Sequence, residues 1–402
     1  MKKIFSILTA SLLWISMAAL LAGCGAEGSG PAQAPEDTSA PPEPTFLEDL
    51  AARALPPLIP EGMTAGQWPA YRAQLIELFS CEVYGFTPPP PKELRARALA
   101  KPEKTDWAGK ADESHIKLSF DTPRGSFSFP VSVALPRGRE NVPLVIAITF
   151  LPYPDGYFLP VEEILDAGFG IAAFCYRDIT WDDIIPLDYI LPFRSLAWRY
   201  PRRGDSAWGK IGMWAFAASR VMDYAQTLDR VDKDRVFVTG HSRLGKTALW
   251  CAAQDERFAG VGVNNSGCGG AAIERGKRGE RVANLTSKSR YYYWFCKNYQ
   301  KYSDRAEEMP FDMHMLAALI APRKLAVCSA EDDSWADPRS EFLCVYAASE
   351  AWDLLGAAGL GAPAEYPTAG AQFAEGRVGY SLRTGTHFFS RDDWLFYLRF
   401  FG

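Results

Sequence analysis

The chain has 402 residues, a formal net charge of −5 at pH 7 and a hydrophobic content of 48 %, which is enough apolar material for a sizeable folded core. A mildly acidic chain without a basic stripe is a poor partner for nucleic acid or for an anionic membrane surface. The four histidines and eight cysteines form no HExxH motif and no close Cys/His cluster, which argues against a bound catalytic metal.

The N-terminus has the layout of a lipoprotein signal peptide. Two lysines precede an apolar run over 4–21, and Cys24 follows the small residues Ala22 and Gly23. The cysteine after such a segment is diacylated and becomes the mature N-terminus, so the apolar run is not a permanent membrane span. We therefore predict a signal peptide over 1–23, lipidation at Cys24 and a secreted protein anchored by lipid to the bacterial cell envelope. An ordinary cleaved signal is the alternative.

The following segment, 24–45, consists mainly of Gly, Ser, Pro, Ala and acidic residues. Such a composition cannot bury a core, so we predict a disordered tether. A single folded domain is predicted over 46–402, because α/β folds often run long and no second linker interrupts the chain. We expect a monomer that contacts the membrane only through its lipid.

Strand-like and helix-like segments alternate in the remaining chain. A helix is predicted over 68–79, and two strands near 116–120 and 127–135 form an antiparallel entry to a sheet. Further apolar strands are predicted over 144–149, 171–176, 236–239, 260–264, 325–329 and 378–382. Apolar residues at steps of three and four predict a helix over 211–228. This alternation predicts an α/β fold with a doubly wound, mostly parallel sheet between two helix layers, with ligands at the carboxyl ends of the strands.

A strand-to-helix turn at Ser242 is the first candidate for chemistry. Residues 236–239 form the predicted strand, and 247–253 have a helical pattern. A serine on such a turn has an exposed hydroxyl, and the N–H of Arg243 can donate to an oxyanion. The spacing departs from G-x-S-x-G, because a leucine occupies the second glycine position and the glycine is Gly245. Taken alone, this turn favours a helix-capping serine.

A serine nucleophile needs a base and an orienting carboxylate. His387 follows the last predicted strand, where the order Ser, acid, His of α/β hydrolases places its histidine. The loop after the next-to-last predicted strand holds three adjacent acids, Glu331, Asp332 and Asp333. Loop acids are usually solvated or cap a helix, but one of these can hold the imidazole in the required tautomer. The residues therefore predict a triad of Ser242, His387 and one of the three acids.

These residues together resemble the glucuronoyl esterase family, carbohydrate esterase family 15, and in particular its bacterial branch. The family has the α/β-hydrolase fold. The resemblance rests on Glu82-Val83-Tyr84-Gly85, on the turn from Gly240 to Trp250, on 264–272, and on the short stretches 319–323, 334–338 and 383–387. The pattern G-x-S-R-x-G-K is the family's replacement for G-x-S-x-G, so the departure at the turn becomes support.

The resemblance implies a serine esterase that cleaves esters of 4-O-methyl-glucuronic acid on glucuronoxylan, in plant walls its esters with lignin alcohols. It implies a charged oxyanion donor at Arg243 and substrate contacts from Lys246, Glu280 and Trp335. It implies no metal and no organic cofactor. Each of the three contact residues also has an ordinary explanation, as an exposed helix lysine, a solvated loop acid and a core or rim aromatic.

The triad acid departs from the commonest family pattern. Many members carry a glutamate at the position of Asn265, which cannot ionise. Other bacterial members use a carboxylate two residues before the tryptophan, which here is Asp333. We therefore assign Asp333 as the acid, with Asp332 as the alternative.

Two other functions stay open. An acetyl xylan esterase or another carbohydrate deacetylase of the same fold keeps the triad and changes the ester. A surface lipoprotein that binds polysaccharide without turnover would treat Asn265 as the mark of a decayed site. The loop acids and His387 argue against that reading.

Overall fold

The structure is a computed structural model that describes residues 44–100, 107–152, 159–183, 187–190, 195–201 and 204–402. Contacts divide the chain between Glu43 and Pro44, and all that follows concerns the unit Pro44–Gly402. The predicted signal peptide, Cys24 and nearly all of the predicted tether lie outside the described residues. Within those residues, no helix combines the length and the apolar character needed to cross a membrane.

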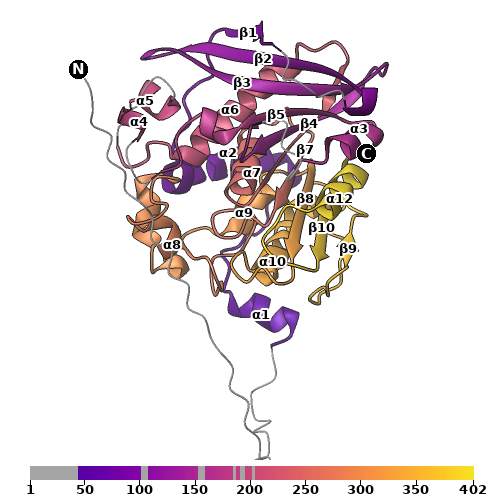
Figure 1. Cartoon of the computed structure of the whole chain (residues 1–402). Coiled ribbons are helices and arrows are strands. Elements are labelled where there is room, and N and C mark those ends of the chain that lie inside the picture. The colour runs from indigo at the N-terminus through magenta and orange to yellow at the C-terminus, as the bar shows by residue number, and fades with distance from the viewer. Residues whose placement is uncertain (1–43, 101–106, 153–158, 184–186, 191–194, 202–203) are drawn as a thin grey trace, which may run out of the picture. The chain divides into compact units, whose positions relative to one another are not determined.

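A ten-stranded sheet runs through this unit (Figure 1). Its strands are β1 Leu94–Ala98, β2 Ala111–Thr122, β3 Gly125–Pro136, β4 Val142–Thr149, β5 Gly170–Cys175, β6 Val231–His241, β7 Gly260–Asn264, β8 Lys324–Ala330, β9 Gln372–Phe373 and β10 Val378–Arg383. The spatial order is β1-β2-β3-β5-β4-β6-β7-β8-β10-β9. From β5 to β10 neighbouring strands are parallel, whereas β1, β2, β3 and β9 pair antiparallel at the two edges. All the predicted strands are present, and β1 and β9 are additions.

Helices cover both faces of this sheet. They are α1 Phe46–Ala52, α2 Trp68–Phe79, α3 Val161–Asp166, α4 Leu187–Ile190, α5 Leu196–Arg199, α6 Lys210–Ala225, α7 Arg243–Gln254, α8 Val282–Thr286, α9 Met313–Ala318, α10 Pro338–Ala348, α11 Glu350–Leu354 and α12 Arg391–Phe401. One core joins α6, α7, α9 and α10 to the sheet, and a second joins α3 and α12 to its other face. Figure 1 shows α3 and α12 side by side. The predicted α/β-hydrolase fold is confirmed.

The burial of each strand follows from its place in the sheet. Every residue of β4, β5 and β7 is buried, as expected for central strands covered on both faces. The edge-side strand β2 instead mixes exposed and buried positions. The long hydrophobic runs in the sequence therefore mark the parallel centre of the sheet, which carries the site at its carboxyl edge.

The candidate residues leave the sheet at neighbouring strand ends. Ser242 follows β6, Asn265 follows β7, the loop with Asp333 follows β8, and His387 follows β10. The chain also runs outward from β4 to β5 and returns across β4 to β6, which is the topological switch point where open α/β sheets bind ligands. The topology therefore gathers these residues along one edge.

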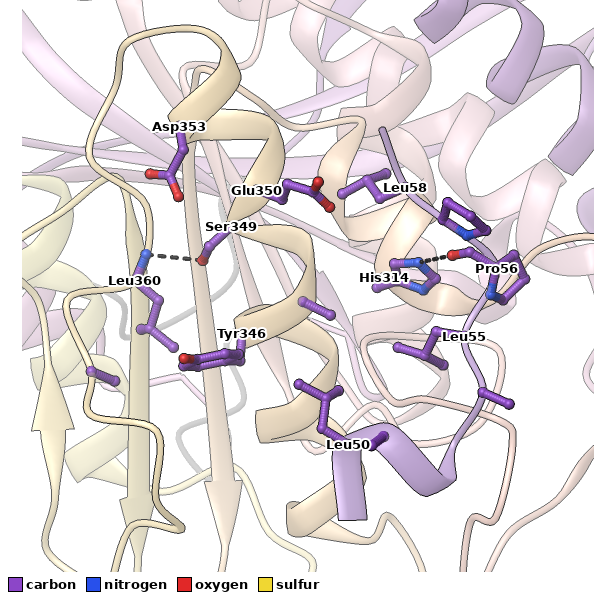
Figure 2. A pocket seen from close by; sticks show the side chains of 15 residues that line it. Leu50, Leu55, Pro56, Leu58, His314, Tyr346, Ser349, Glu350, Asp353 and Leu360 are labelled. Carbon is purple, nitrogen blue, oxygen red and sulfur yellow. Dashed lines mark hydrogen bonds between the residues drawn. The ribbon is translucent and has the colours of Figure 1, made fainter. Parts of the chain in front are cut away.

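A separate cavity of about 660 Å³ lies against α1, α10 and α11 (Figure 2). The Ser349 hydroxyl in its wall donates to the Val345 carbonyl at 2.9 Å and accepts from the Leu360 N–H at 2.9 Å. His314 Nε2 donates to the Pro56 carbonyl at 3.1 Å. None of the predicted site residues lines this cavity. Its hydroxyl, Ser349, and its imidazole, His314, bond to different backbone groups and not to each other. The cavity is therefore not the candidate active site.

Candidate active site

The Ser242 turn has the geometry of a nucleophile elbow. Ser242 has φ 56° and ψ −125°, a costly conformation for a residue with a side chain, and its N–H donates to the Asn264 carbonyl at 2.8 Å. A Cβ at Gly240 would lie 2.2 Å from the Leu244 carbonyl oxygen, and a Cβ at Gly245 would lie 3.1 Å from the Asn264 carbonyl oxygen. Both glycines therefore let α7 pack closely on β6 and β7, which gives the shifted second glycine a structural reason.

His387 and Asp333 meet beside this turn. His387 Nδ1 lies 2.6 Å from Asp333 Oδ2, and the His387 side chain is 35 % exposed whereas that of Asp333 is buried. Burial alone would raise the pKa of Asp333, but the hydrogen bond and charge of His387 and the N–H of Ala336 together hold that pKa below its ordinary value. An ionised carboxylate can only accept, so Nδ1 carries a proton, and in the neutral imidazole Nε2 is then the acceptor. This is the tautomer that a general base needs.

The His387 ring lies close to the nucleophile turn. Its centroid is 4.6 Å from that of His241, the residue before Ser242. In the described part of the chain, no hydrogen bond joins the Ser242 hydroxyl to His387, and such bonds commonly tighten only when substrate binds. The turn, the base and the acid are thus together, and their catalytic roles are a proposal.

Asn265 takes a supporting place beside the acid. Its Nδ2 donates to Asp333 Oδ2 at 2.6 Å, and the Ala336 N–H donates to Asp333 Oδ1 at 3.1 Å. Asn265 Oδ1 is buried with no hydrogen-bond partner among the described residues. By contrast, Glu331 and Asp332 are exposed. At the position where the resemblance predicts a glutamate, the side-chain amide of Asn265 therefore donates to the Asp333 carboxylate.

The other histidines are engaged within the fold. His241 Nδ1 bonds Asn264 Oδ1 at 2.5 Å, and burial and the charge of His387 lower the pKa of His241 to about 3, so it stays neutral. His115 Nδ1 bonds the Ser132 hydroxyl at 2.8 Å. No group of three or more His, Cys, Asp or Glu side chains within the described residues is arranged to hold a metal ion.

Arg243 is held by an anion and an aromatic surface. Its Nη1 donates to Asp182 Oδ2, and the side chain is 26 % exposed. The guanidinium carbon lies 4.6 Å from the Trp294 ring centroid, 5.6 Å from that of Phe150 and 5.8 Å from that of Tyr291. A guanidinium over aromatic faces is attracted by the ring quadrupoles. The charged group of the residue after Ser242 is therefore held by Asp182 and the rings, and it remains in contact with solvent.

Lys246 lies one helical turn further along and is sealed from solvent. Its side chain is 2 % exposed, and Nζ donates to Glu280 Oε2 at 2.7 Å and to the Ser266 carbonyl at 2.5 Å. Glu280 is also buried. The prediction that both residues bind sugar hydroxyls is not tested by this structure, which shows them bonded to each other.

Trp335 projects from the loop that carries the acid. It is 39 % exposed, and its carbonyl accepts a hydrogen bond from the Glu280 N–H at 2.8 Å. A Cβ at Gly279 would lie 2.1 Å from the Ser334 carbonyl oxygen, so the two loops touch at this glycine. Trp335 and Glu280 thus lie on two loops that touch, and Lys246 on α7 is bonded to Glu280.

Sequence reasoning missed several residues around the site. Asp182 and Trp294 hold Arg243, and Trp294 Nε1 donates to Asp182 Oδ1 at 2.7 Å. Glu341 on α10 accepts from the Gly267 N–H at 3.0 Å and from the Ser329 hydroxyl at 2.6 Å. The aromatic run 291–295 was a visible signal for Trp294, but nothing near Asp182 or Glu341 in the sequence distinguishes them from other acids.

A family model described as glucuronyl esterase, fungi, matches residues 119–356, a stretch that contains the Ser242 turn and the loop with Asp333. The chain belongs to the glucuronyl esterase family. This family match confirms the resemblance drawn from the short motifs, and it places the nucleophile turn inside the matched region.

Curated relatives agree with this family. A carbohydrate esterase, MZ0003, from an unknown prokaryotic organism is 39 % identical over 241 residues, which are 60 % of this chain and 54 % of the relative. A 4-O-methyl-glucuronoyl methylesterase of Podospora anserina is 29 % identical over 301 residues, or 72 % of this chain and 57 % of the relative. The chain therefore spans little more than half the length of these two relatives.

A solved structure gives fuller coverage. A glucuronoyl esterase from Solibacter usitatus is 33 % identical, with a TM-score of 0.77, and the match covers 86 % of this chain and 96 % of that one. This similarity extends over nearly the whole of that protein, and it supports the fold described above.

Proposed function

We propose that this chain is a serine esterase that hydrolyses esters of 4-O-methyl-glucuronic acid on glucuronoxylan, including its esters with lignin alcohols. The observation that carries the proposal is the short bond between His387 and the buried Asp333 beside the strained Ser242 turn. Family membership supplies the substrate class, because curated relatives bear the name 4-O-methyl-glucuronoyl methylesterase. The proposed substrate partner is the uronate ester, and no cofactor enters the reaction.

The reaction follows from the proposed roles of these groups. Ser242 attacks the ester carbonyl while His387 Nε2 takes its proton, and Asp333 stabilises the imidazolium that forms. The Arg243 side chain and the N–H at the start of α7 stabilise the oxyanion, since a charged donor adds to a neutral one. The alcohol then leaves with the proton from His387. Water, activated by the same base, releases the uronic acid and restores Ser242.

Substrate contacts are proposed for Trp335, Lys246 and Glu280. The exposed Trp335 ring offers a flat apolar surface to a sugar, and the bonded pair Lys246 and Glu280 supplies the proposed polar contacts. The charged Arg243, next to Ser242 in the chain, supports stabilisation of an oxyanion at the acyl carbon, and family membership supplies the sugar acid.

The predicted lipid anchor at Cys24 agrees with a polymeric substrate outside the cell. An anchored monomer with the predicted tether 24–45 would keep the domain 46–402 at the envelope while it acts on soluble xylan fragments. Mass spectrometry of the native N-terminus tests this placement, with a diacylated Cys24 as the expected result and an unmodified start elsewhere as the contrary one.

A panel of esters tests the proposed reaction. Purified enzyme is expected to hydrolyse benzyl and methyl D-glucuronate with a kcat/KM at least about tenfold above that for acetylated xylose, which corresponds to roughly 1.4 kcal/mol of preference. A higher kcat/KM for the acetylated sugar would replace the proposal with a carbohydrate deacetylase. A protein that hydrolyses neither ester and is not labelled at Ser242 by a fluorophosphonate would be a binding protein.

Paired variants test the acid. Asp333→Asn is expected to lower kcat by up to about 10⁴-fold, because the amide cannot hold the required tautomer. Asp332→Asn is the matched control, since its exposed side chain should leave kcat within a factor of two. The reverse pattern would move the role to Asp332.

A further inference from the structure

Asp182 is a buried carboxylate at the candidate site that no motif marks. Its side chain is 2 % exposed. Among the described residues its donors include Arg243 Nη1 and the Tyr176 hydroxyl at 3.1 Å on Oδ2, Trp294 Nε1 at 2.7 Å on Oδ1, and the side chain of Tyr293. Tyr176 lies six residues before Asp182, whereas Arg243 and Trp294 come from segments far along the chain, so Asp182 joins these segments.

The two residues before Asp182, Thr180 and Trp181, are hydrogen-bonded to Asp188 and Lys210. Asp188 forms an ion pair with Lys210 at 3.0 Å and accepts from the Thr180 hydroxyl at 2.8 Å. Lys210 Nζ also donates to the Trp181 carbonyl, next to Asp182. Because Lys210 starts the long buried helix α6, the carboxylate of Asp182 has a rigid support.

The Arg243 guanidinium is bonded to a carboxylate and packed on a ring, yet its side chain is partly exposed. Asp182 takes Nη1, and the Trp294 ring, itself stacked on Tyr291 at 4.1 Å, lies against the guanidinium face. About a quarter of the side chain stays exposed, since it is 26 % accessible. The guanidinium that solvent reaches is therefore already paired with a carboxylate.

The charge of the acyl group changes during the proposed reaction. The ester that enters is neutral at its carboxyl. When water cleaves the acyl bond to Ser242, its oxygen joins the acyl carbon, Ser242 regains its proton through His387, and the uronic acid formed loses a proton to solvent. An arginine without a counterion would bind the resulting carboxylate as a strong bidentate pair, and product would leave slowly.

We propose that Asp182 is a positioning residue that fixes Arg243 toward the oxyanion and also offsets its charge, so that the uronate product is released. This inference rests on the proposed esterase function and assigns a role in product release to the same site. A carboxylate in contact with the guanidinium lowers its attraction for a second carboxylate, because the two anions compete for one cation and repel each other.

The substitution Asp182→Asn separates charge from shape. The amide oxygen can still accept from Trp294 or Tyr176, whereas the negative charge is lost. The matched control is Asp183→Asn, since Asp183 is the exposed neighbour in the chain. Both variants are to be compared with wild type in thermal melts, in kcat and KM for benzyl D-glucuronate, and in the inhibition constant of free D-glucuronate, with D-xylose as an uncharged comparison.

For Asp182→Asn we expect the inhibition constant of D-glucuronate to fall at least tenfold and kcat to fall at least tenfold, with KM for the neutral ester and inhibition by D-xylose within threefold of wild type. Asp183→Asn should match wild type. A folded Asp182→Asn enzyme with unchanged kcat and unchanged glucuronate inhibition would overturn the inference, and a change in kcat alone would overturn its charge component.

A second variant covers the case in which Asp182→Asn does not fold. Asp182→Glu keeps the charge and displaces it, so kcat should fall at least threefold while glucuronate inhibition stays within threefold of wild type. Wild-type kcat in Asp182→Glu would overturn the positioning role. Failure of the wild type to hydrolyse benzyl D-glucuronate would instead refute the esterase function, so the two failures are distinguishable.

Discussion

Arg243 and Lys246 leave α7 one turn apart, and each meets a buried carboxylate from a distant loop, yet the two ion pairs differ in what they can reach. The Arg243 side chain is 26 % exposed and lies against aromatic rings. The Lys246 side chain is 2 % exposed, and its partner Glu280 is equally enclosed. One pair thus keeps a cation within reach of solvent, and the other joins α7 to the segments of Ser266 and Glu280.

The difference separates a cation that solvent reaches from one that the fold encloses. In the sequence, both cations look like exposed residues in the first turn of a helix. In the fold, the loop with Glu280 helps to enclose Lys246, whereas Asp182 and the aromatic rings leave the Arg243 side chain 26 % exposed. The open pair should therefore govern rate, and the sealed pair should govern stability.

The largest effect is expected from breaking the sealed pair. Lys246→Met leaves Glu280 buried without its cation, which should lower the free energy of unfolding by about 3–5 kcal/mol. Urea denaturation measures this change. Adding Glu280→Leu to Lys246→Met should recover more than half of the loss, because no unpaired charge remains. If Lys246→Met were as stable as wild type, the enclosure of the ion pair between Lys246 and Glu280 would be contradicted.

Arg243→Lys tests the open pair. A lysine keeps a charge near Asp182 but loses the planar fork, so kcat/KM for benzyl D-glucuronate should fall by about 10²–10³-fold, the usual cost of an oxyanion donor. The free energy of unfolding should change by less than about 1 kcal/mol. An unchanged rate would remove Arg243 from the oxyanion site.

Glu341 extends the comparison to a buried carboxylate held by neutral donors. Burial raises its pKa from 4.5 to about 7, so the folded protein keeps a proton that the unfolded chain releases. Its contribution to stability is complete below pH 4.5 and is lost as pH rises to about 7, by up to about 3 kcal/mol. Glu341→Gln should flatten the pH dependence of unfolding in that window. An identical slope in both proteins would contradict the shifted pKa.

Trp335→Ala should give the smallest effect on the fold. The ring is 39 % exposed, so the free energy of unfolding should change by less than about 0.5 kcal/mol. Loss of the aromatic surface should raise KM for glucuronoxylan fragments by roughly threefold to tenfold, in line with about 1 kcal/mol for such a contact. KM for benzyl D-glucuronate should change less. Equal KM values for the polymer fragments would remove Trp335 from the substrate site.

Much of the fold could be predicted because its centre is a local pattern. Continuous apolar runs gave the parallel strands, and the helix over 68–79 was predicted with the bounds that α2 has. The strands β1 and β9 were missed because they lie at sheet edges, where β1 is partly exposed and β9 has only two residues. A strand that is largely exposed or very short lacks the apolar run by which a strand is predicted.

The site was predictable where strand ends bring residues together. Ser242, Asp333 and His387 each follow a strand, so topology alone placed them along one edge. Asp182 and Glu341 were not predictable, because their partners arrive from elsewhere in the fold, and an acid destined for burial looks like any other acid in the sequence. The same reason hid the enclosure of Lys246.

Hydrolysis of benzyl D-glucuronate by wild type and by Ser242→Ala tests the central claim most directly. We predict turnover by the wild type and a fall in kcat of at least about 10³-fold in Ser242→Ala, with the same thermal midpoint in both proteins. A folded Ser242→Ala enzyme that hydrolyses this ester at the wild-type rate would contradict the account.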